Sequence, residues 1–190
     1  ELLKNRNLLG LFGSYFASGF GFQFFVTWLP TFLIQEHHVS LTASGFYTAV
    51  PLATGAVGCA VGGAVADWLS RRLGSISLGR RAVATCGFIL GAIGFLLAMQ
   101  APTPQVAVAW LSLATAAHDL TLSSVWASCT DIGGSYGGTA AGFVNLASSL
   151  SGIMAPLLAA WLATTFGSFS IVLPVAAALY LAAAVLWQFI

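Results

Sequence analysis

The hydrophobic pattern of the chain consists of long apolar runs separated by short polar segments. A helix needs about 20 predominantly apolar residues to cross the hydrocarbon core of a bilayer. Six runs of about that length or longer are present, at residues 8–34, 43–69, 82–100, 106–129, 139–166 and 169–189. Most of the charged residues lie between these runs. The pattern therefore predicts an all-α membrane protein with six transmembrane helices.

The composition supports lipid rather than water as the surrounding medium. The chain is 58% hydrophobic and 6% charged, with a mean hydropathy of +0.93. A soluble domain carries about 25% charged residues, which cover its surface. This chain has too few charges for that, so we expect the lipid bilayer as a partner. The net charge of +1 gives no indication of a nucleic-acid partner.

The basic residues predict the orientation of the chain in the membrane. All six are expected on one side, before the first run or between the second and third: Lys4, Arg6, Arg71, Arg72, Arg80 and Arg81. Loops on the cytoplasmic side of a membrane carry an excess of lysine and arginine. We therefore expect an integral protein of the plasma membrane, the inner membrane in a bacterium, with both ends of this chain cytoplasmic.

Neither the cysteines nor the histidines predict a metal site. Three cysteines lie inside apolar runs without metal-like spacing, and an odd number argues against a disulfide framework: Cys59, Cys86 and Cys129. Glu36, His37 and His38 lie in a short loop with no second group of ligands elsewhere in the chain. We expect no metal and no cofactor.

One carboxylate lies deep in a predicted span. Asp119 is about 13 residues, or about 20 Å, into the fourth run. A charged side chain at that depth costs about 2.5–3.5 kcal/mol on insertion scales, so Asp119 needs a wet cavity, a partner or a proton. Ser123 and Trp126 share its helix face, at i+4 and i+7. This face either lines a cavity or is a hydrogen-bonded helix contact. His118 lies about 100° away around the helix, where helix packing is the favoured interpretation.

Two other runs carry polar residues on one face. In the first run, Gln23 and Thr27 follow Gly19 at helical spacing. In the fifth run, Asn145 lies on a glycine-rich face with Gly142 and Gly152. Small residues allow helices to approach closely, and a substrate groove built from amide donors needs the same arrangement. Both interpretations stay open for Asn145.

The end of the second run carries a spaced motif, Gly63-x-x-x-Asp67-x-x-x-Arg71-Arg72. An acidic residue at the C-terminal end of a helix is unfavourable against the helix dipole. Asp67 therefore needs compensation from Arg71, one turn away, or from the start of the helix near Gly138. A clamp of this kind predicts a gating loop. The motif resembles the loop motif of the major facilitator superfamily.

Two further segments resemble the anion:cation symporter family of that superfamily, which includes transporters of sugar acids, hexuronates and phthalates. They are the residues 24–33 and the residues 126–145. The resemblance implies that the six spans are helices seven to twelve of a twelve-helix fold, the C-terminal half, with the N-terminal half absent from this chain. It places the substrate contribution of this half on Gln23, Ser123, Trp126 and Asn145. The chain departs from the family pattern after Asn145, where Ala147-Ser148-Ser149 follows.

The resemblance also implies a function. It predicts a fragment of a secondary active transporter that moves an organic anion, such as a sugar acid, by proton- or sodium-coupled alternating access. No lysine or arginine lies at depth in the six runs. The missing half is therefore expected to provide the basic group that binds the anion and the main coupling carboxylate. Asp119 is a secondary candidate for protonation.

Three alternatives belong to other functional classes. The first is a major facilitator transporter of a drug or a neutral sugar. The second is an intramembrane enzyme, for which the chain lacks a Gly-x-Ser-Gly motif, a His-Glu-x-x-His motif and paired intramembrane aspartates. The third is a membrane scaffold or sensor without transport activity. We expect a transporter and not an enzyme.

Overall fold

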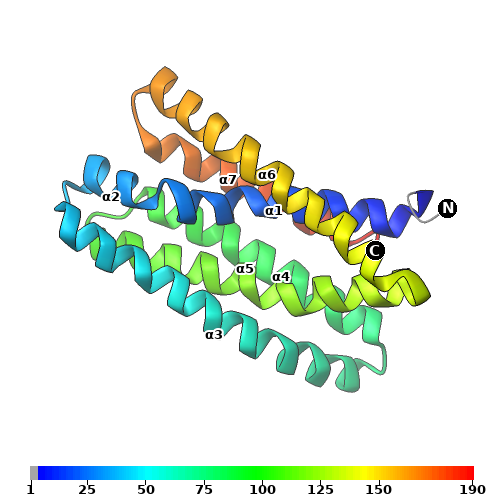
Figure 1. Cartoon of the computed structure of the whole chain (residues 1–190). Coiled ribbons are helices and arrows are strands. Elements are labelled where there is room, and N and C mark those ends of the chain that lie inside the picture. The colour runs from blue at the N-terminus through cyan, green and yellow to red at the C-terminus, as the bar shows by residue number, and fades with distance from the viewer. Residues whose placement is uncertain (1–3) are drawn as a thin grey trace.

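The computed structural model describes residues 4–190, which form a bundle of helices (Figure 1). The first crossing consists of α1 (Arg6–Thr27) followed by α2 (Leu29–His37). The remaining helices are α3 (Leu41–Leu73), α4 (Ile76–Met99), α5 (Pro104–Gly133), α6 (Gly137–Phe166) and α7 (Val172–Trp187). Two short 3₁₀ helices, η2 (Gly134–Tyr136) and η3 (Phe169–Ile171), join α5 to α6 and α6 to α7.

The described residues contain five helical stretches that are long and apolar enough to cross a membrane. One of them, Pro104–Phe166, has 63 residues and includes both α5 and α6. Figure 1 shows these two helices running in opposite directions, so this stretch makes two crossings. The bundle therefore crosses the bilayer six times.

The structure corrects the prediction of one helix at residues 8–34. The first crossing breaks at Trp28, which ends α1 and precedes α2. Pro30 is at the start of α2, where its missing N–H would have no helical partner in any case. The indole Nε1–H of Trp28 donates a hydrogen bond to the carbonyl oxygen of Pro156 in α6, at 3.2 Å. The break is thus tied to a proline of a neighbouring helix.

Two predicted loops are also shorter than expected. The polar segment at residues 70–81 is mostly helical, because α3 continues to Leu73 and α4 begins at Ile76. The turn between them uses Gly74 at a φ of 65°, which glycine adopts without a Cβ penalty. The segment after Cys129 likewise continues α5 to Gly133. Polar residues in water at the membrane surface extend a helix without cost, so hydropathy underestimates its length.

The core lies between α1, α4 and α7 and is built from aromatic side chains. Five of them form what we call the aromatic cluster: Phe24, Phe25, Phe88, Phe95 and Tyr180. The rings of Phe25 and Phe95 stack at 5.4 Å, and Tyr180 meets Phe95 edge to face at 5.2 Å. Large apolar side chains such as Ile93 and Trp161 instead face outward, as lipid contact requires.

On the other side of the core, α3 packs closely against α5. A Cβ atom added at Gly58 or Gly62 would overlap the backbone carbonyl of Ala116 or Leu120. Glycine at these positions therefore lets the two helix backbones approach each other. This close approach brings α3 to the middle of α5.

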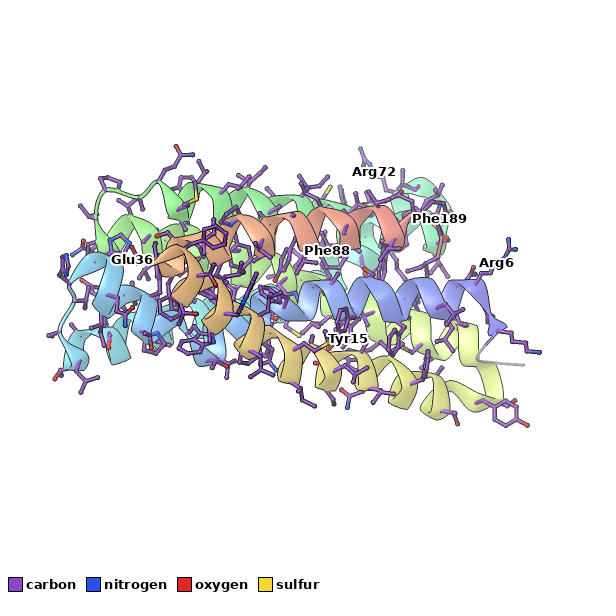
Figure 2. All side chains as sticks on the ribbon, turned by 90° about the horizontal axis from the view of Figure 1, so that it is seen from above. Arg6, Tyr15, Glu36, Arg72, Phe88 and Phe189 are labelled. Atoms are coloured by element: carbon purple, nitrogen blue, oxygen red, sulfur yellow. The ribbon has the colours of Figure 1, made fainter. Side chains whose placement is uncertain are left out.

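The two ends of the bundle differ in charge. One end of the bundle, which we call the basic end, carries Arg6 at the start of α1, Arg71 and Arg72 at the end of α3, and Arg80 and Arg81 near the start of α4. Figure 2 shows Arg6 and Arg72 at this end and Glu36 at the opposite end. Glu36 Oε1 accepts hydrogen bonds from Ser168 Oγ and from the backbone N–H of Phe169, both at 2.7 Å. The carboxylate thus fastens α2 to the turn before α7.

Candidate functional site

A small cavity lies where α1, α5 and α6 meet. It has a volume of about 70 Å³ and is lined by Tyr15, Gly19, Phe22, His118, Asp119, Leu122 and Ser148. We call it the Asp119 cavity. Figure 2 shows Tyr15 on the α1 ribbon, beside α6. Because these residues come from the middle of their helices, the cavity lies at depth in the bundle rather than at either end.

Asp119 occupies the middle of α5, and its side chain is 14% exposed. Its Oδ1 atom is buried and receives no hydrogen bond from the protein. Its Oδ2 atom lies against Gly55 of α3, where an added Cβ would overlap it. The close approach of α3 thus leaves space for the carboxylate but provides no donor for it.

His118 lies beside Asp119 as well as within the helix packing. Its ring stacks on Phe22 of α1 at 5.8 Å and lies against Tyr180 of α7 at the same distance. The packing interpretation therefore describes its ring correctly. The prediction that it faces away from Asp119 is incomplete, because His118 Nε2 is 4.0 Å from Asp119 Oδ1 and both residues line the cavity. Side-chain torsions bring together groups that the helical wheel separates.

The residues predicted for the substrate lie on three helices, α1, α5 and α6, and none of them lines the cavity itself. Trp126 of α5 is 38% exposed, and its ring meets Tyr15 edge to face at 5.7 Å. Ser123 lies one turn from Asp119, and its Oγ is buried without a hydrogen-bond partner from the protein. Gln23 of α1 lies against Gly152 of α6, where an added Cβ would be 2.5 Å from Gln23 Nε2.

Asn145 is the predicted substrate residue that the structure does not join to the others. It is exposed on α6, and its backbone carbonyl accepts a hydrogen bond from Ser149 Oγ at 3.3 Å. Among residues 4–190, no hydrogen bond or ring contact links it to Gln23, Ser123 or Trp126. Its side chain therefore faces outward, free of the packing that the alternative interpretation assigned to it.

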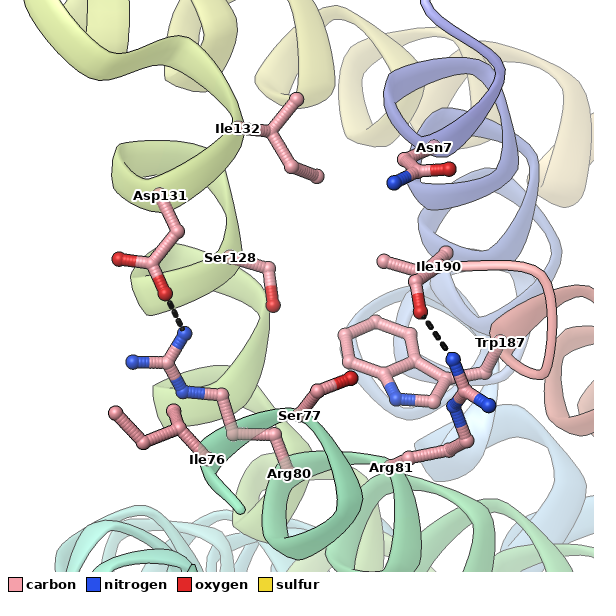
Figure 3. Close-up of a pocket in the computed structure, with 10 residues that line it drawn as sticks. All are labelled: Asn7, Ile76, Ser77, Arg80, Arg81, Ser128, Asp131, Ile132, Trp187 and Ile190. Carbon is pink, nitrogen blue, oxygen red and sulfur yellow. Dashed lines mark hydrogen bonds and ion pairs between the residues drawn. The ribbon is translucent and has the colours of Figure 1, made fainter.

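The charges at the basic end are arranged differently from the prediction. Arg80, near the start of α4, forms an ion pair with Asp131, near the end of α5. Figure 3 shows Arg80 pointing to Asp131 and Arg81 pointing to the carbonyl of Ile190. These residues line a pocket of about 320 Å³. The Arg81–Ile190 hydrogen bond is 2.6 Å long. A cation near a helix start and an anion near a helix end are each unfavourable, and the ion pair offsets both.

The predicted clamp between Asp67 and Arg71 is absent from this structure. Within the described part of the chain, Asp67 is exposed and takes part in no ion pair. Because α3 continues to Leu73, Asp67 lies before the last turn of the helix, and that turn contains Arg71 and Arg72, which suit the negative end of the helix dipole. Arg72 lies 5.8 Å from the ring centroid of Trp68.

Sequence reasoning missed Tyr15, Phe22 and Ser148 of the cavity and the ion pair at the basic end. Tyr15 and Phe22 follow the spacing i and i+7 with Gly19 between them, so a helical wheel of the first run would have found them. Ser148 was noted only as a departure from a family pattern. The pairing of Arg80 with Asp131, 51 residues apart, leaves no signal in a single sequence.

The fold and the cavity together define an integral membrane protein with the architecture of a major facilitator transporter. The structure superposes on part of a solved peptide transporter, POT, with a TM-score of 0.71 and 15% sequence identity. The match covers 95% of this chain and 37% of the solved one. At that identity, the likeness establishes the fold.

Sequence comparison gives the family relation. The chain is 32% identical over 165 residues to the probable sulfoacetate transporter SauU of Cupriavidus necator, covering 86% of this chain and 38% of the relative. It is 28% identical to the probable galactarate/D-glucarate transporter GudP of Escherichia coli, covering 90% and 38%. It is 29% identical to a D-galactonate transporter of Escherichia coli, covering 88% and 39%. No family model matches the chain.

The chain is related to the anion:cation symporters of the major facilitator superfamily. It spans a little over a third of the length of these curated relatives. The relatives are transporters and not enzymes, which confirms the predicted class.

Proposed function

We propose that this chain forms the C-terminal six-helix half of a secondary transporter for an organic anion, coupled to a proton or another cation. The observation that carries the proposal is the Asp119 cavity, a polar cavity at mid-depth between three helices of a chain related to anion transporters. In such transporters the substrate and coupling-ion sites lie near the bilayer midplane, and two repeats rock around them. The N-terminal half would complete the site.

The proposed substrate surface follows α5 from the cavity toward the basic end. Ser123 and Trp126 continue the helix face of Asp119, Tyr15 joins Trp126 to the cavity, and Gln23 flanks it on α1. Asn145 would reach the substrate from α6 through its exposed side chain. These groups offer hydroxyl, amide and indole donors that suit the oxygens of a carboxylate or a polyhydroxy acid.

An anion also needs a positive charge, which the middle of this chain lacks. All the described lysines and arginines lie at the basic end. We assign the cationic group to the missing half, as the partner that faces Ser123 and Trp126 across the substrate path. We propose that the basic end is cytoplasmic, in line with the positive-inside rule, and that the membrane is the plasma membrane, the inner membrane in a bacterium.

The gating loop stays part of the proposal, but the partner proposed for Asp67 is now a group from the other half instead of Arg71. Asp67 is exposed at the basic end, where a charged group from the other half can pair with it in one conformation and release it in the other. Gly63 lies on the same helix within van der Waals reach of Ser123, with an added Cβ at 3.8 Å. Arg71 and Arg72 complete this segment.

The test uses the intact transporter that contains this chain, reconstituted in liposomes with a pH-sensitive dye inside. Sulfoacetate, D-glucarate, galactarate and D-galactonate are offered as labelled anions, with a neutral sugar beside them. Uptake of one acid with internal acidification supports the proposal. Uptake of the neutral sugar alone, or of no compound by folded protein, contradicts it.

A residue-level test compares Trp126→Ala with Ile93→Ala, a matched truncation of a lipid-facing side chain on α4. Loss of the indole should weaken the apparent affinity for the transported anion about tenfold, equivalent to about 1.4 kcal/mol. Ile93→Ala should leave the affinity unchanged. Equal affinities for the two variants would remove Trp126 from the proposed substrate surface.

A further inference from the structure

Two neighbouring titratable side chains in the Asp119 cavity have no hydrogen-bond partner from the protein. Asp119 Oδ1 and His118 Nδ1 are both buried and unpartnered, and the His118 side chain is only 5% exposed. An unsatisfied buried polar atom costs about 1–3 kcal/mol, and more when the group is charged. Two such atoms on adjacent residues indicate that a ligand other than a protein side chain satisfies them.

The size of the cavity restricts that ligand. A water molecule needs about 10–15 Å³ of accessible volume, so a cavity of about 70 Å³ accepts a few waters but no sugar acid. His118 Nε2 and Asp119 Oδ1 are 4.0 Å apart, a separation that one water can bridge with two hydrogen bonds. The cavity is therefore suited to water and to the protons that water carries.

The chemistry of the lining favours a proton over a metal cation. Hard cations bind several oxygen ligands, but a nitrogen heterocycle and the rings of Tyr15 and Phe22 occupy much of this wall. Within residues 4–190, no three His, Cys, Asp or Glu side chains gather to hold a metal ion. A carboxylate and an imidazole side by side are instead the two groups that exchange protons most readily near neutral pH.

We infer that His118 and Asp119 form the binding site for the co-transported proton. This inference rests on the proposed function and identifies its coupling ion. A hydronium ion in the cavity transfers its proton to Asp119 Oδ1, which forms an O–H bond and leaves a neutral water. The proton stays on Asp119, and the new O–H group donates a hydrogen bond to a water that bridges to His118 Nε2, 4.0 Å away. The pair changes from a net charge of −1 to neutral.

The groups around the pair do not supply a competing charge. Tyr15 approaches from α1 and Tyr180 from α7, and both are neutral phenols in the membrane interior. The contacts from α3 and α6 come from Gly55 and Ser148, neither of which titrates. All described lysines and arginines lie at the basic end, at or near the starts of α1 and α4 or in the last turn of α3. The charge of the pair therefore depends on its own proton.

The position of the pair couples the proton to the anion. Ser123 and Trp126 of the proposed substrate surface lie on the same helix face as Asp119, one and two turns away. A bound anion repels the ionised pair and therefore strengthens its hold on the proton. By thermodynamic reciprocity, the proton strengthens anion binding by the same factor. This mutual dependence is the requirement for symport.

The functional test compares Asp119→Asn with the wild type in the intact, reconstituted transporter, with Ile93→Ala as the control. Asparagine has the size of protonated aspartic acid but cannot exchange the proton. The variant should keep exchange of labelled for unlabelled anion across the membrane while losing anion-driven proton uptake. Proton uptake at the wild-type ratio to anion in Asp119→Asn would overturn the inference. So would transport by the wild type that requires sodium and not a proton gradient.

A second measurement does not depend on transport. Infrared difference spectra of the purified protein, recorded between acidic and alkaline buffer, should contain a carboxylic acid band that is missing in Asp119→Asn. In His118→Gln the band should remain but titrate at a different pH. If the wild type carries no anion yet shows this band, the proposed function fails and the proton site stands. Spectra that are identical in the wild type and Asp119→Asn overturn the proton site itself.

Discussion

The aromatic cluster and the Asp119 cavity lie side by side in the bundle and are built on opposite principles. In the aromatic cluster, Phe25, Phe95 and Tyr180 are fully buried and fit ring against ring. In the cavity, Asp119 and His118 are buried but leave polar atoms unpartnered. Tyr180 touches both regions, through Phe95 and through His118. The comparison shows a closely packed scaffold next to a site that keeps buried polar atoms without partners. Unfavourable burial of this kind is typical of functional sites.

The largest loss of stability is expected from a substitution that creates an empty space in the aromatic cluster. Phe95 is completely buried and contacts Phe24, Phe25 and Tyr180. Phe95→Ala should lower the free energy of unfolding by about 3–5 kcal/mol, because it removes ring contacts that the neighbours cannot replace. Chemical unfolding of the intact protein in detergent, followed by tryptophan fluorescence, measures this. Leu96→Ala is the matched control, since Leu96 is 39% exposed; an equal loss there would contradict the assignment of the core.

The next effect tests the close approach of α3 to α5, which places Gly55 against Asp119. Gly58→Ala places a Cβ against the carbonyl of Ala116 and should destabilise the protein by about 1–3 kcal/mol, as overpacking does. Gly45→Ala, in the same helix, meets nothing within 4 Å. It should instead stabilise by about 0.4–1 kcal/mol, because the unfolded chain loses freedom. The same unfolding assay compares the two variants. Changes in the free energy of unfolding that have the same sign in both would refute the packing argument.

A smaller effect, of opposite sign to that of Phe95→Ala, is expected at Asp119. Asp119→Asn removes an unpaired buried charge and should raise the free energy of unfolding at neutral pH by about 1 kcal/mol. Asp67→Asn makes the same change at an exposed acid and should stay within about 0.5 kcal/mol of the wild type. Destabilisation by Asp119→Asn would show that the carboxylate is a structural partner, which would remove the contrast between the two regions.

The smallest change in the free energy of unfolding is expected at the basic end, outside both regions. Arg80→Gln breaks the ion pair with Asp131, whose side chain is 60% exposed, and should cost about 0–1 kcal/mol. Arg71→Gln removes an exposed arginine from the last turn of α3 and provides the comparison. Raising the salt concentration should reduce the difference between Arg80→Gln and the wild type. A loss as large as that of Phe95→Ala would show that this end holds the bundle together.

Part of the candidate site could be predicted because it lies on one helix. Asp119, Ser123 and Trp126 share a face of α5 by periodicity alone, and a charge in an apolar run marks that face as unusual. The wall formed by Tyr15, Phe22 and Ser148 comes from two other helices. Its position depends on how far each helix is rotated about its own axis, which apolar runs without a strong amphipathic pattern do not specify.

The gating loop illustrates the same limit at a helix end. The motif from Gly63 to Arg72 predicts charges in contact, since their spacing is local. The contact that formed joins Arg80 to Asp131 instead, two residues that meet only because α4 and α5 pack side by side. A single sequence indicates which charges need compensation but not which partner supplies it.

The six apolar segments, the gathering of the basic residues at one end and the depth of Asp119 could all be predicted from the amino-acid sequence. These are local properties, because bilayer thickness and helical rise convert residue number directly into position. The break at Trp28, the partner of Arg80 and the placement of His118 beside Asp119 depend instead on how the helices pack. Each depends on how close two helices come and which faces they turn to each other, and atoms distant in sequence, such as Gly58 and the carbonyl of Ala116, control that approach.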